Sequence, residues 1–229
     1  YTLGAKGHLN CLDANSGKVL WQQNIIKENK SEVPYWGVST SPFIYKDSVI
    51  LSPGGQNNNA IISLNAESGK VIWKKHNGNQ VYSTPTLFKI LNEEQLIVAL
   101  EGKILSLNPN NGELLWSHKW KIYVNNHNIA QPAQLNDDTL LVTAGYGTGA
   151  EAFQIIRDGK KMRTKILWKS KLLKTKFSSA IYWDGFIYGL NESRLVCLNA
   201  KDGSLKWRGK KYGYGKIVAA SGHLIILGD

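Results

Sequence analysis

Short apolar runs separated by polar, glycine-containing turns recur along the whole chain. The runs are four or five residues long, which suits strands and is far too short for a membrane-spanning helix. Shorter segments precede these runs, and three of them begin just after a proline, where a strand loses no ladder hydrogen bond. The pattern predicts an all-β protein whose apolar strands lie near 48–51, 96–100, 139–143 and 186–190.

One eleven-residue unit occurs four times without gaps. In each copy a glycine stands four residues before a closing tryptophan, and Asp or Asn stands eight residues before it. This pattern predicts a β-hairpin in which the glycine supplies a positive φ and the Asp or Asn side chain accepts backbone N–H groups. The copies are Cys11–Trp21, Ser63–Trp73, Ser106–Trp116 and Cys197–Trp207, and a looser copy with a lengthened turn runs from Phe153 through Gly159 to Trp168.

The closing tryptophans are roughly 40 to 50 residues apart, which is the length of one four-stranded propeller blade. We therefore expect residues 1–229 to form a single β-propeller domain or a portion of one, in a ring of about six to eight blades. Both ends include the second strand of a blade, so they are not expected to combine into one. The expected divisions are a partial blade at 1–25, full blades at about 38–75, 81–118, 128–170 and 176–209, and a partial blade at 215–229.

The eleven-residue units resemble the tryptophan-docking motif of the pyrroloquinoline-quinone (PQQ) type propeller repeat. In that family a small residue opens the motif and the tryptophan ring stacks between blades; here Cys11, Ser63, Ser106 and Cys197 open it. The resemblance implies a structural docking role for Trp21, Trp73, Trp116, Trp168 and Trp207 with Gly17, Gly69, Gly112 and Gly203. It also gives both cysteines a role as small buried packing residues, without a disulfide between them.

The sequence outside these units looks most like that of bacterial PQQ-binding-like propeller proteins without demonstrated enzyme activity. The similar stretches are 1–5, 52–55, 145–149 and 216–218. This resemblance implies a non-catalytic scaffold in the cell envelope that binds a protein or a ligand at the propeller face, without a cofactor, and a periplasmic or otherwise extracytoplasmic location. Tyr1 falls inside a strand pattern, so a signal segment would lie outside this sequence.

The alternative is a portion of a PQQ-dependent alcohol or sugar dehydrogenase, which would bind PQQ with calcium. By resemblance such enzymes carry adjacent paired cysteines and a calcium site of acidic and amide side chains, and this sequence has neither pattern. We assign no catalytic, cofactor-binding or metal-binding residue. His8, His76, His118, His127 and His223 lie in different blades without metal-ligand spacing, which predicts surface or loop positions.

The glycine-rich stretch 145–149 has two interpretations. It lacks the Gly-Lys-Ser/Thr sequence and the helix of a phosphate-binding loop. The stretch 52–59 occupies the equivalent place two blades earlier, so both stretches are predicted to be tight connections between the second and third strands of a blade, where glycine allows close backbone approach.

Four residues lie just before the predicted inner strands and mark the axial rim. They are Trp36, Tyr82, His127 and Lys176. In propellers these connections line the axial mouth, so we expect this set to bind a small or extended anionic ligand, the alternative being ordinary loop residues. Trp36, Trp120 and Trp183 are the tryptophans that the repeat does not explain.

The positive charge is concentrated in the second half of the chain. Of 28 Lys and Arg residues against 17 acids, residues 115–229 carry 18 basic and 8 acidic side chains. Stretches within 160–216 form a basic edge that could dock an acidic partner or an acidic polymer, or be an ordinary solvated face. Nucleic acid is disfavoured because no aromatic residues are interleaved for base stacking. The basic edge consists of Lys160, Lys161, Arg163, Lys165, Lys169, Lys171, Lys174, Lys176, Lys206, Arg208, Lys210, Lys211 and Lys216.

Overall fold

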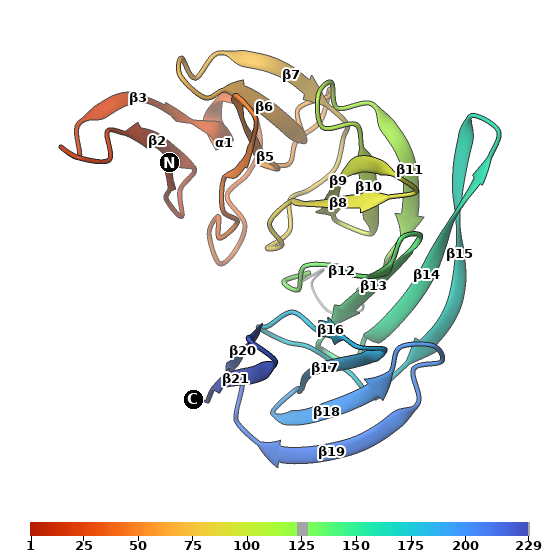
Figure 1. Ribbon diagram of the computed structural model, residues 1–229. Helices are drawn as coiled ribbons and strands as arrows, with labels where there is room; N and C mark the ends of the chain where they lie inside the picture. The colour runs from red at the N-terminus through yellow and green to blue at the C-terminus, as the bar shows by residue number, and fades with distance from the viewer. Residues whose placement is uncertain (123–127, 229) are drawn as a thin grey trace. The chain divides into compact units, whose positions relative to one another are not determined.

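The computed structural model describes residues 1–122 and 128–228, and it consists of antiparallel β-sheets with one four-residue helix (Figure 1). The predicted all-β class with four-stranded antiparallel sheets is confirmed. The first sheet contains β1 (Thr2–Leu3), β2 (His8–Leu12) and β3 (Val19–Asn24), and helix α1 (Ile25–Glu28) follows it. The second sheet contains β4 (Phe43–Tyr45), β5 (Ser48–Leu51), β6 (Ile61–Asn65) and β7 (Val71–Lys75).

The remaining sheets repeat the same order along the chain. The third contains β8 (Thr86–Ile90), β9 (Glu93–Leu100), β10 (Lys103–Leu107) and β11 (Leu114–Lys119). The fourth contains β12 (Ala133–Asn136), β13 (Thr139–Ala144), β14 (Gly149–Asp158) and β15 (Lys161–Ser170). The fifth contains β16 (Ile181–Trp183), β17 (Phe186–Asn191), β18 (Arg194–Asn199) and β19 (Leu205–Lys211), and β20 (Lys216–Ala220) pairs with β21 (His223–Leu227).

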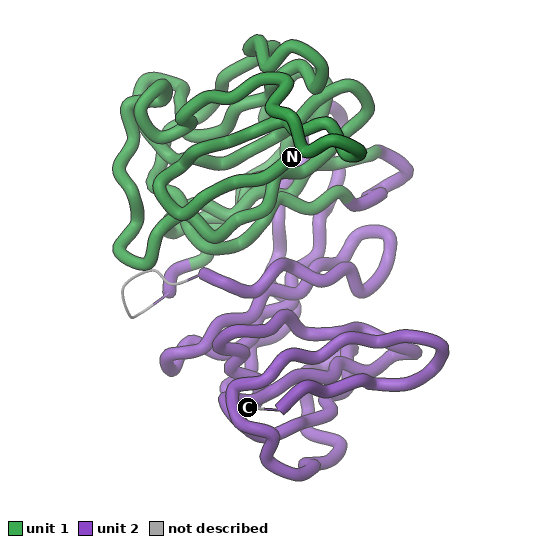
Figure 2. Tube along the Cα trace, turned by 90° about the vertical axis from the view of Figure 1, so that its left-hand side faces the viewer, with its two compact units in different colours: residues 1–87, 94–120 green, residues 88–93, 121–229 purple. Residues whose placement is uncertain are grey.

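The chain divides into two compact units (Figure 2). Unit 1 comprises residues 1–87 and 94–120, and unit 2 comprises residues 88–93 and 121–229. In unit 1 consecutive residues of β5 face opposite ways: Val49 and Leu51 join one buried cluster with Leu9 and Leu64, whereas Ile50 joins another with Leu96. This arrangement explains why the middle strands read as continuous apolar runs. Unit 2 has a comparable core that includes Leu141, Ile187 and Val196.

The repeated hairpin turns are fixed by their own side chains, as predicted. Asp13 Oδ1 accepts hydrogen bonds from the backbone N–H and the hydroxyl of Ser16, both at 2.7 Å. Asn65 does the same for Ser68, at 2.9 and 2.7 Å. The glycine that follows has a φ of 69° in both turns, which is a conformation that glycine adopts without strain.

The closing tryptophans of three sheets lie against the glycine turn of the sheet that follows. A Cβ built on Gly69 would stand 2.9 Å from the Trp21 ring, and one built on Gly112 would stand 2.7 Å from the Trp73 ring. Trp168 meets Gly203 in the same way in unit 2. The indole N–H groups of Trp21 and Trp168 donate to the carbonyls of Ala66 and Ala200 at 2.9 and 3.0 Å.

The other two closing tryptophans differ in their surroundings. Trp116 is buried, and its indole N–H donates to Gln95 Oε1 at 2.8 Å, whereas Trp207 is partly exposed. Cys11 and Cys197 are buried free thiols opposite Trp21 and Trp207 in their sheets.

Three details of the sequence interpretation are corrected. The fourth hairpin is longer because β14 and β15 have ten residues each, whereas its turn is tight, with Asp158 opposite Lys161. His118 is buried in β11 instead of lying at the surface. The sequence pattern also missed α1, a single turn in which Asn24 Oδ1 accepts the N–H groups of Ile26 and Lys27.

Candidate functional site

The connection from α1 to β4 presents an exposed aromatic pair in unit 1. Tyr35 is 87% exposed and Trp36 is 68% exposed, and their rings meet edge to face with centroids 4.7 Å apart. Val33, two residues earlier, is also exposed. A proline precedes the pair and a glycine follows it, at Pro34 and Gly37. The connection therefore exposes three large apolar side chains outside the core, two of them in contact.

Hydrogen bonds hold this connection in place. The backbone N–H of Trp36 donates to the Tyr82 hydroxyl at 3.3 Å, and the Gln80 side-chain amide donates to the Glu32 carbonyl at 2.8 Å. The Val38 N–H donates to the Ala5 carbonyl at 2.8 Å. The aromatic pair is therefore presented by a backbone that is anchored on both sides.

A groove of about 430 Å³ lies beside Tyr35. Two of its lining residues are glycines for a steric reason. Gly54 and Gly55 have φ values of 72° and 134°, and a Cβ on Gly54 would stand only 2.6 Å from the backbone nitrogen of Gln80. Gln80 Oε1 is buried and has no hydrogen-bond partner in the described residues. We call this groove, together with Trp36, the aromatic groove. It is lined by Lys30, Ser31, Glu32, Val33, Pro34, Tyr35, Pro53, Gly54, Gly55, Gln56, Asn79 and Gln80.

Lys176 lies in unit 2 among three aromatic rings. Its ammonium group is 4.3 Å from the centroid of Tyr214, 5.0 Å from that of Tyr146 and 5.4 Å from that of Phe177. Phe177 and Tyr214 meet edge to face at 5.9 Å. The positive charge of Lys176 is therefore already placed over ring faces, which attract cations.

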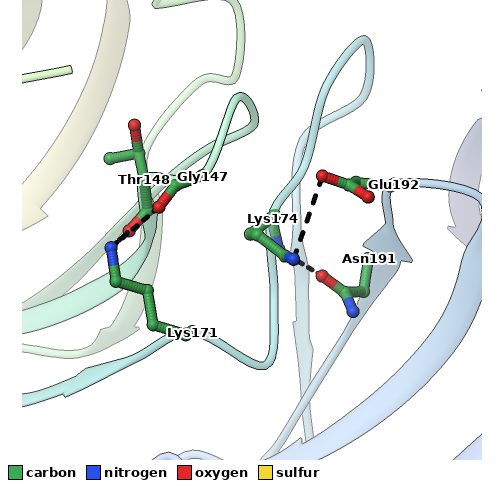
Figure 3. Close-up of polar contacts among 6 residues, drawn as sticks. All are labelled: Gly147, Thr148, Lys171, Lys174, Asn191 and Glu192. Carbon is green, nitrogen blue, oxygen red and sulfur yellow. Dashed lines mark hydrogen bonds and ion pairs between the residues drawn. The ribbon is translucent and has the colours of Figure 1, made fainter. Parts of the chain in front are cut away.

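Neighbouring lysines of the basic edge also make contacts within the protein (Figure 3). Lys171 Nζ donates to the carbonyls of Gly147 and Thr148 at 2.7 and 2.8 Å, and Lys174 Nζ lies 3.8 Å from Glu192. Lys169 forms an ion pair at 2.6 Å with Glu151, which is buried. Lys216 Nζ donates to the Phe177 carbonyl. These lysines stabilise connections and compensate a buried charge.

The glycine-rich stretches are tight connections, as predicted. Residues 145–149 join β13 to β14, and a Cβ on Gly149 would stand 2.4 Å from the backbone carbonyl oxygen of Ser170. Residues 52–59 join β5 to β6 in the same manner. Neither stretch precedes a helix.

Of the four predicted rim residues, Trp36 and Tyr82 meet in unit 1, Lys176 belongs to unit 2, and His127 lies outside the described residues. A common ligand site formed by all four stays a prediction. Sequence reasoning missed Tyr35 and Gln80. The signal that could have indicated Tyr35 is a pair of adjacent aromatic residues in a polar connection, where burial does not require them.

Shifted pKa values occur at structural positions. Burial raises the pKa of the Cys197 thiol, and a hydrogen bond with Tyr188 acts against this rise. Burial and the neighbouring Cys197 raise the pKa of Tyr188. Hydrogen bonds from Ser16 lower the pKa of Asp13 in its turn, and Ser204 lowers that of Asp202 in the same way. None of these groups lines the aromatic groove.

Over residues 1–122 and 128–228, no three His, Cys, Asp or Glu side chains gather where they could hold a metal ion. None of the described helices is long and apolar enough to cross a membrane.

Comparisons with known proteins agree on one architecture. The profile of the family described as outer membrane protein assembly factor BamB matches residues 1–209. BamB from Moraxella catarrhalis superposes with a TM-score of 0.69 at 17% identity, over 97% of this chain and 65% of BamB. The C-terminal WD40 domain of Sif2 superposes with a TM-score of 0.56 at 11% identity, over 94% of this chain and 57% of that domain.

One curated relative is an enzyme. Quinoprotein alcohol dehydrogenase PedH from Pseudomonas putida is 27% identical over 124 residues, which is 51% of this chain and 20% of PedH. The chain thus spans one fifth of PedH and less than two thirds of BamB. The solved structures confirm the predicted β-propeller fold.

Proposed function

Because this chain belongs to the BamB family of PQQ-like β-propellers, we propose that it is a non-catalytic scaffold that binds a protein partner through the aromatic groove. The family description, an outer membrane protein assembly factor, supports a scaffold role, and it also supports our proposal of an extracytoplasmic location.

The exposed Tyr35–Trp36 pair is the observation that carries this proposal. A ring that is 87% exposed gains nothing from folding, because its apolar surface stays in water. Tyr and Trp are the residues that most often dominate binding energy at protein interfaces. The anchored backbone holds the pair in place before binding, so less conformational entropy is lost on association.

The groove beside the pair favours a polypeptide over a small apolar ligand. Its lining combines amide and charged side chains with Val33, Pro34 and Tyr35, which resembles a polar rim around an apolar centre. Lys30 and Glu32 at the groove offer opposite charges to the same partner.

Site-specific photo-crosslinking in cells tests the proposal. We expect the full-length protein with p-benzoylphenylalanine in place of Tyr35 to form a discrete adduct with an outer membrane protein or a component of its assembly. The same group in place of Val19, which is exposed on β3 of the same unit, is the matched control and should form none. Identical adducts from both positions, or an adduct at position 35 that persists in full when Trp36 is changed to Ala, would refute the groove as the binding surface.

A portion of a PQQ-dependent dehydrogenase is the second candidate, because the sequence match to PedH favours it. In that case calcium would need ligands other than a cluster of His, Cys, Asp or Glu side chains among the described residues, because no three of these gather there. Addition of PQQ and calcium to the full-length protein, followed by dye-linked oxidation of alcohols and sugars, separates the two candidates. Turnover that depends on both additions would replace the scaffold proposal.

A further inference from the structure

Three connections of unit 2 meet around one lysine side chain. They join β13 to β14 (145–148), β15 to β16 (171–180) and β19 to β20 (212–215). Each contributes an aromatic ring whose centroid lies within 5.4 Å of the Lys176 ammonium group. We call this group of residues the lysine–aromatic cluster, and it consists of Tyr146, Lys176, Phe177, Tyr214 and Lys216.

The cluster contains two positive charges. Lys216, the first residue of β20, donates through its ammonium group to the carbonyl of Phe177, so both lysines lie beside one short piece of backbone. The three connections that meet here contain no Asp or Glu. Among the described residues, the Lys176 side chain has neither an ion pair nor a hydrogen bond, and ring faces stabilise its charge. The cluster therefore favours an anion.

The connection that carries Lys176 and Phe177 is held in place by hydrogen bonds on several sides (Figure 3). Lys171 Nζ donates to two carbonyls of the connection between β13 and β14. The backbone N–H of Lys174 donates to Asn191 Oδ1 at 3.0 Å. The hydroxyl of the next residue lies 2.6 Å from a buried hydroxyl of β13. The cluster is thus organised before any ligand arrives, so less conformational entropy is lost on binding.

Tyr146 has a backbone conformation that is uncommon for an aromatic residue. Its φ is 53°, in the left-handed region that disfavours residues with a bulky side chain and that glycine adopts without strain. Glycines stand on both sides of it, yet this position carries a ring. The ring centroid lies 5.0 Å from the Lys176 ammonium group. Backbone strain of this kind is concentrated at functional sites, and here it places one wall of the cluster.

From this combination we propose that the lysine–aromatic cluster binds an acidic saccharide through one carboxylated sugar ring. The apolar C–H face of the sugar packs against Phe177 and Tyr214, which are 39% and 42% exposed. The carboxylate accepts hydrogen bonds from the ammonium groups of Lys176 and Lys216, and such charge-assisted bonds are about twice as strong as those between neutral groups. The aromatic groove of unit 1 plays no part in this contact.

Two other anionic partners use the cluster less completely. A nucleic-acid base stacks flat on a ring face, whereas here the Lys176 ammonium group lies over a face of each ring. An acidic peptide side chain supplies a carboxylate without a broad apolar face. A carboxylated sugar ring supplies both within one unit, so that the rings and the lysines contact the same group.

Isothermal titration calorimetry with the full-length protein and trigalacturonate tests the assignment. We expect binding that the K176Q/K216Q variant weakens at least about tenfold, because two charge-assisted hydrogen bonds are lost. The matched control, K160Q/K161Q, removes two exposed lysines of the same unit at the turn between β14 and β15. It should change the affinity by less than about twofold, as expected for charges far from the ligand. Circular dichroism establishes that each variant is folded.

Two further probes separate the contribution of the rings from that of the charges. The methyl ester of trigalacturonate keeps the sugar rings without the charges, and it should bind at least about tenfold more weakly than the acid. Tyr214→Leu removes one ring, and it should weaken binding of the acid about threefold to tenfold. Y35A/W36A, in the aromatic groove, should leave this binding unchanged, so loss of the proposed protein partner and loss of the saccharide are distinguishable.

Four results would overturn the assignment. They are absence of measurable binding to trigalacturonate, equal binding of the methyl ester, an equal loss in K160Q/K161Q, and equal or tighter binding of a thymidine trinucleotide or of triglutamate. The last result would show that the cluster recognises negative charge without the sugar ring.

Discussion

Replacement of a turn glycine by alanine measures how strongly one sheet docks on the next. Gly112 has a φ of 71° and faces the Trp73 ring of the preceding sheet, whereas Gly17 has a φ of 69° and nothing within 4 Å of its would-be Cβ. Both glycines belong to unit 1 and to equivalent turns. The two substitutions therefore introduce the same backbone strain and differ in the contact with the tryptophan.

The expected energies follow from this geometry. Alanine in the left-handed region costs about 1–2 kcal/mol at either position. At Gly112 the new methyl carbon would stand 2.7 and 2.8 Å from Trp73 Cε3 and Cζ3, so the ring or the turn has to move. Overpacking of this kind costs about 1–3 kcal/mol more. G112A should therefore lower the free energy of unfolding by about 2–5 kcal/mol, against about 1–2 kcal/mol for G17A.

Urea unfolding followed by far-ultraviolet circular dichroism measures both free energies without relying on tryptophan fluorescence. A double-mutant cycle with W73L supplies the control, because removal of the ring should reduce the cost of G112A to that of G17A. Equal destabilisation by G17A and G112A in the wild-type background would refute the reasoning, and so would a cost of G112A that is unchanged by W73L.

Three other outcomes are expected. Q95L removes the acceptor shared by Ser106 Oγ at 2.7 Å and Trp116 Nε1 at 2.8 Å, so it should lower the free energy of unfolding by about 2–4 kcal/mol in urea titrations. Burial raises the pKa of Cys197, so at neutral pH this thiol should react with a disulfide reagent only after guanidinium is added, and fast labelling of the native protein would contradict the structure. Hydrogen bonds from Ser16 lower the pKa of Asp13 in the folded protein. The stabilising effect of the Asp13 carboxylate is therefore present above its unfolded pKa of about 3.9 and is lost as pH falls through the lower folded value. D13N should make the free energy of unfolding less dependent on pH in this acid range, and an unchanged pH dependence would contradict the link between this turn and pH.

The hairpins could be predicted from sequence because their determinants are local. Asp13 and Asn65 bond to groups two or three residues away, and the glycine that follows needs no distant partner to explain its conformation. The same holds for the middle strands, because a strand that is buried on both faces is apolar at nearly every position and can be recognised as a continuous apolar run. Four-stranded sheets and their order along the chain therefore follow from pattern alone.

The surroundings of individual side chains could not be predicted in this way. Lys169 and Lys165 are four residues apart on β15 and both are exposed, yet Lys169 forms an ion pair with the buried Glu151 of the neighbouring strand, whereas no ion pair is found for Lys165 among the described residues. Charge counting treats them as equal. The predicted surface or loop position of His118 is wrong for a similar reason, because a polar residue type does not indicate which face of the sheet its side chain occupies.

Recognition in this molecule is best sought where the chain departs from its own repeat. The positions of the repeat are used by the sheets themselves. The Asp or Asn side chain accepts hydrogen bonds within the turn, and in three copies the glycine makes room for the tryptophan ring of the preceding sheet. A residue that satisfies these demands is not free to adapt to a partner. The connection at 29–41 lies outside the repeated unit, and it exposes an aromatic pair that folding does not require. This pair is therefore independent of blade construction, so that variants there can remove binding while the core, and hence the free energy of unfolding, stays the same.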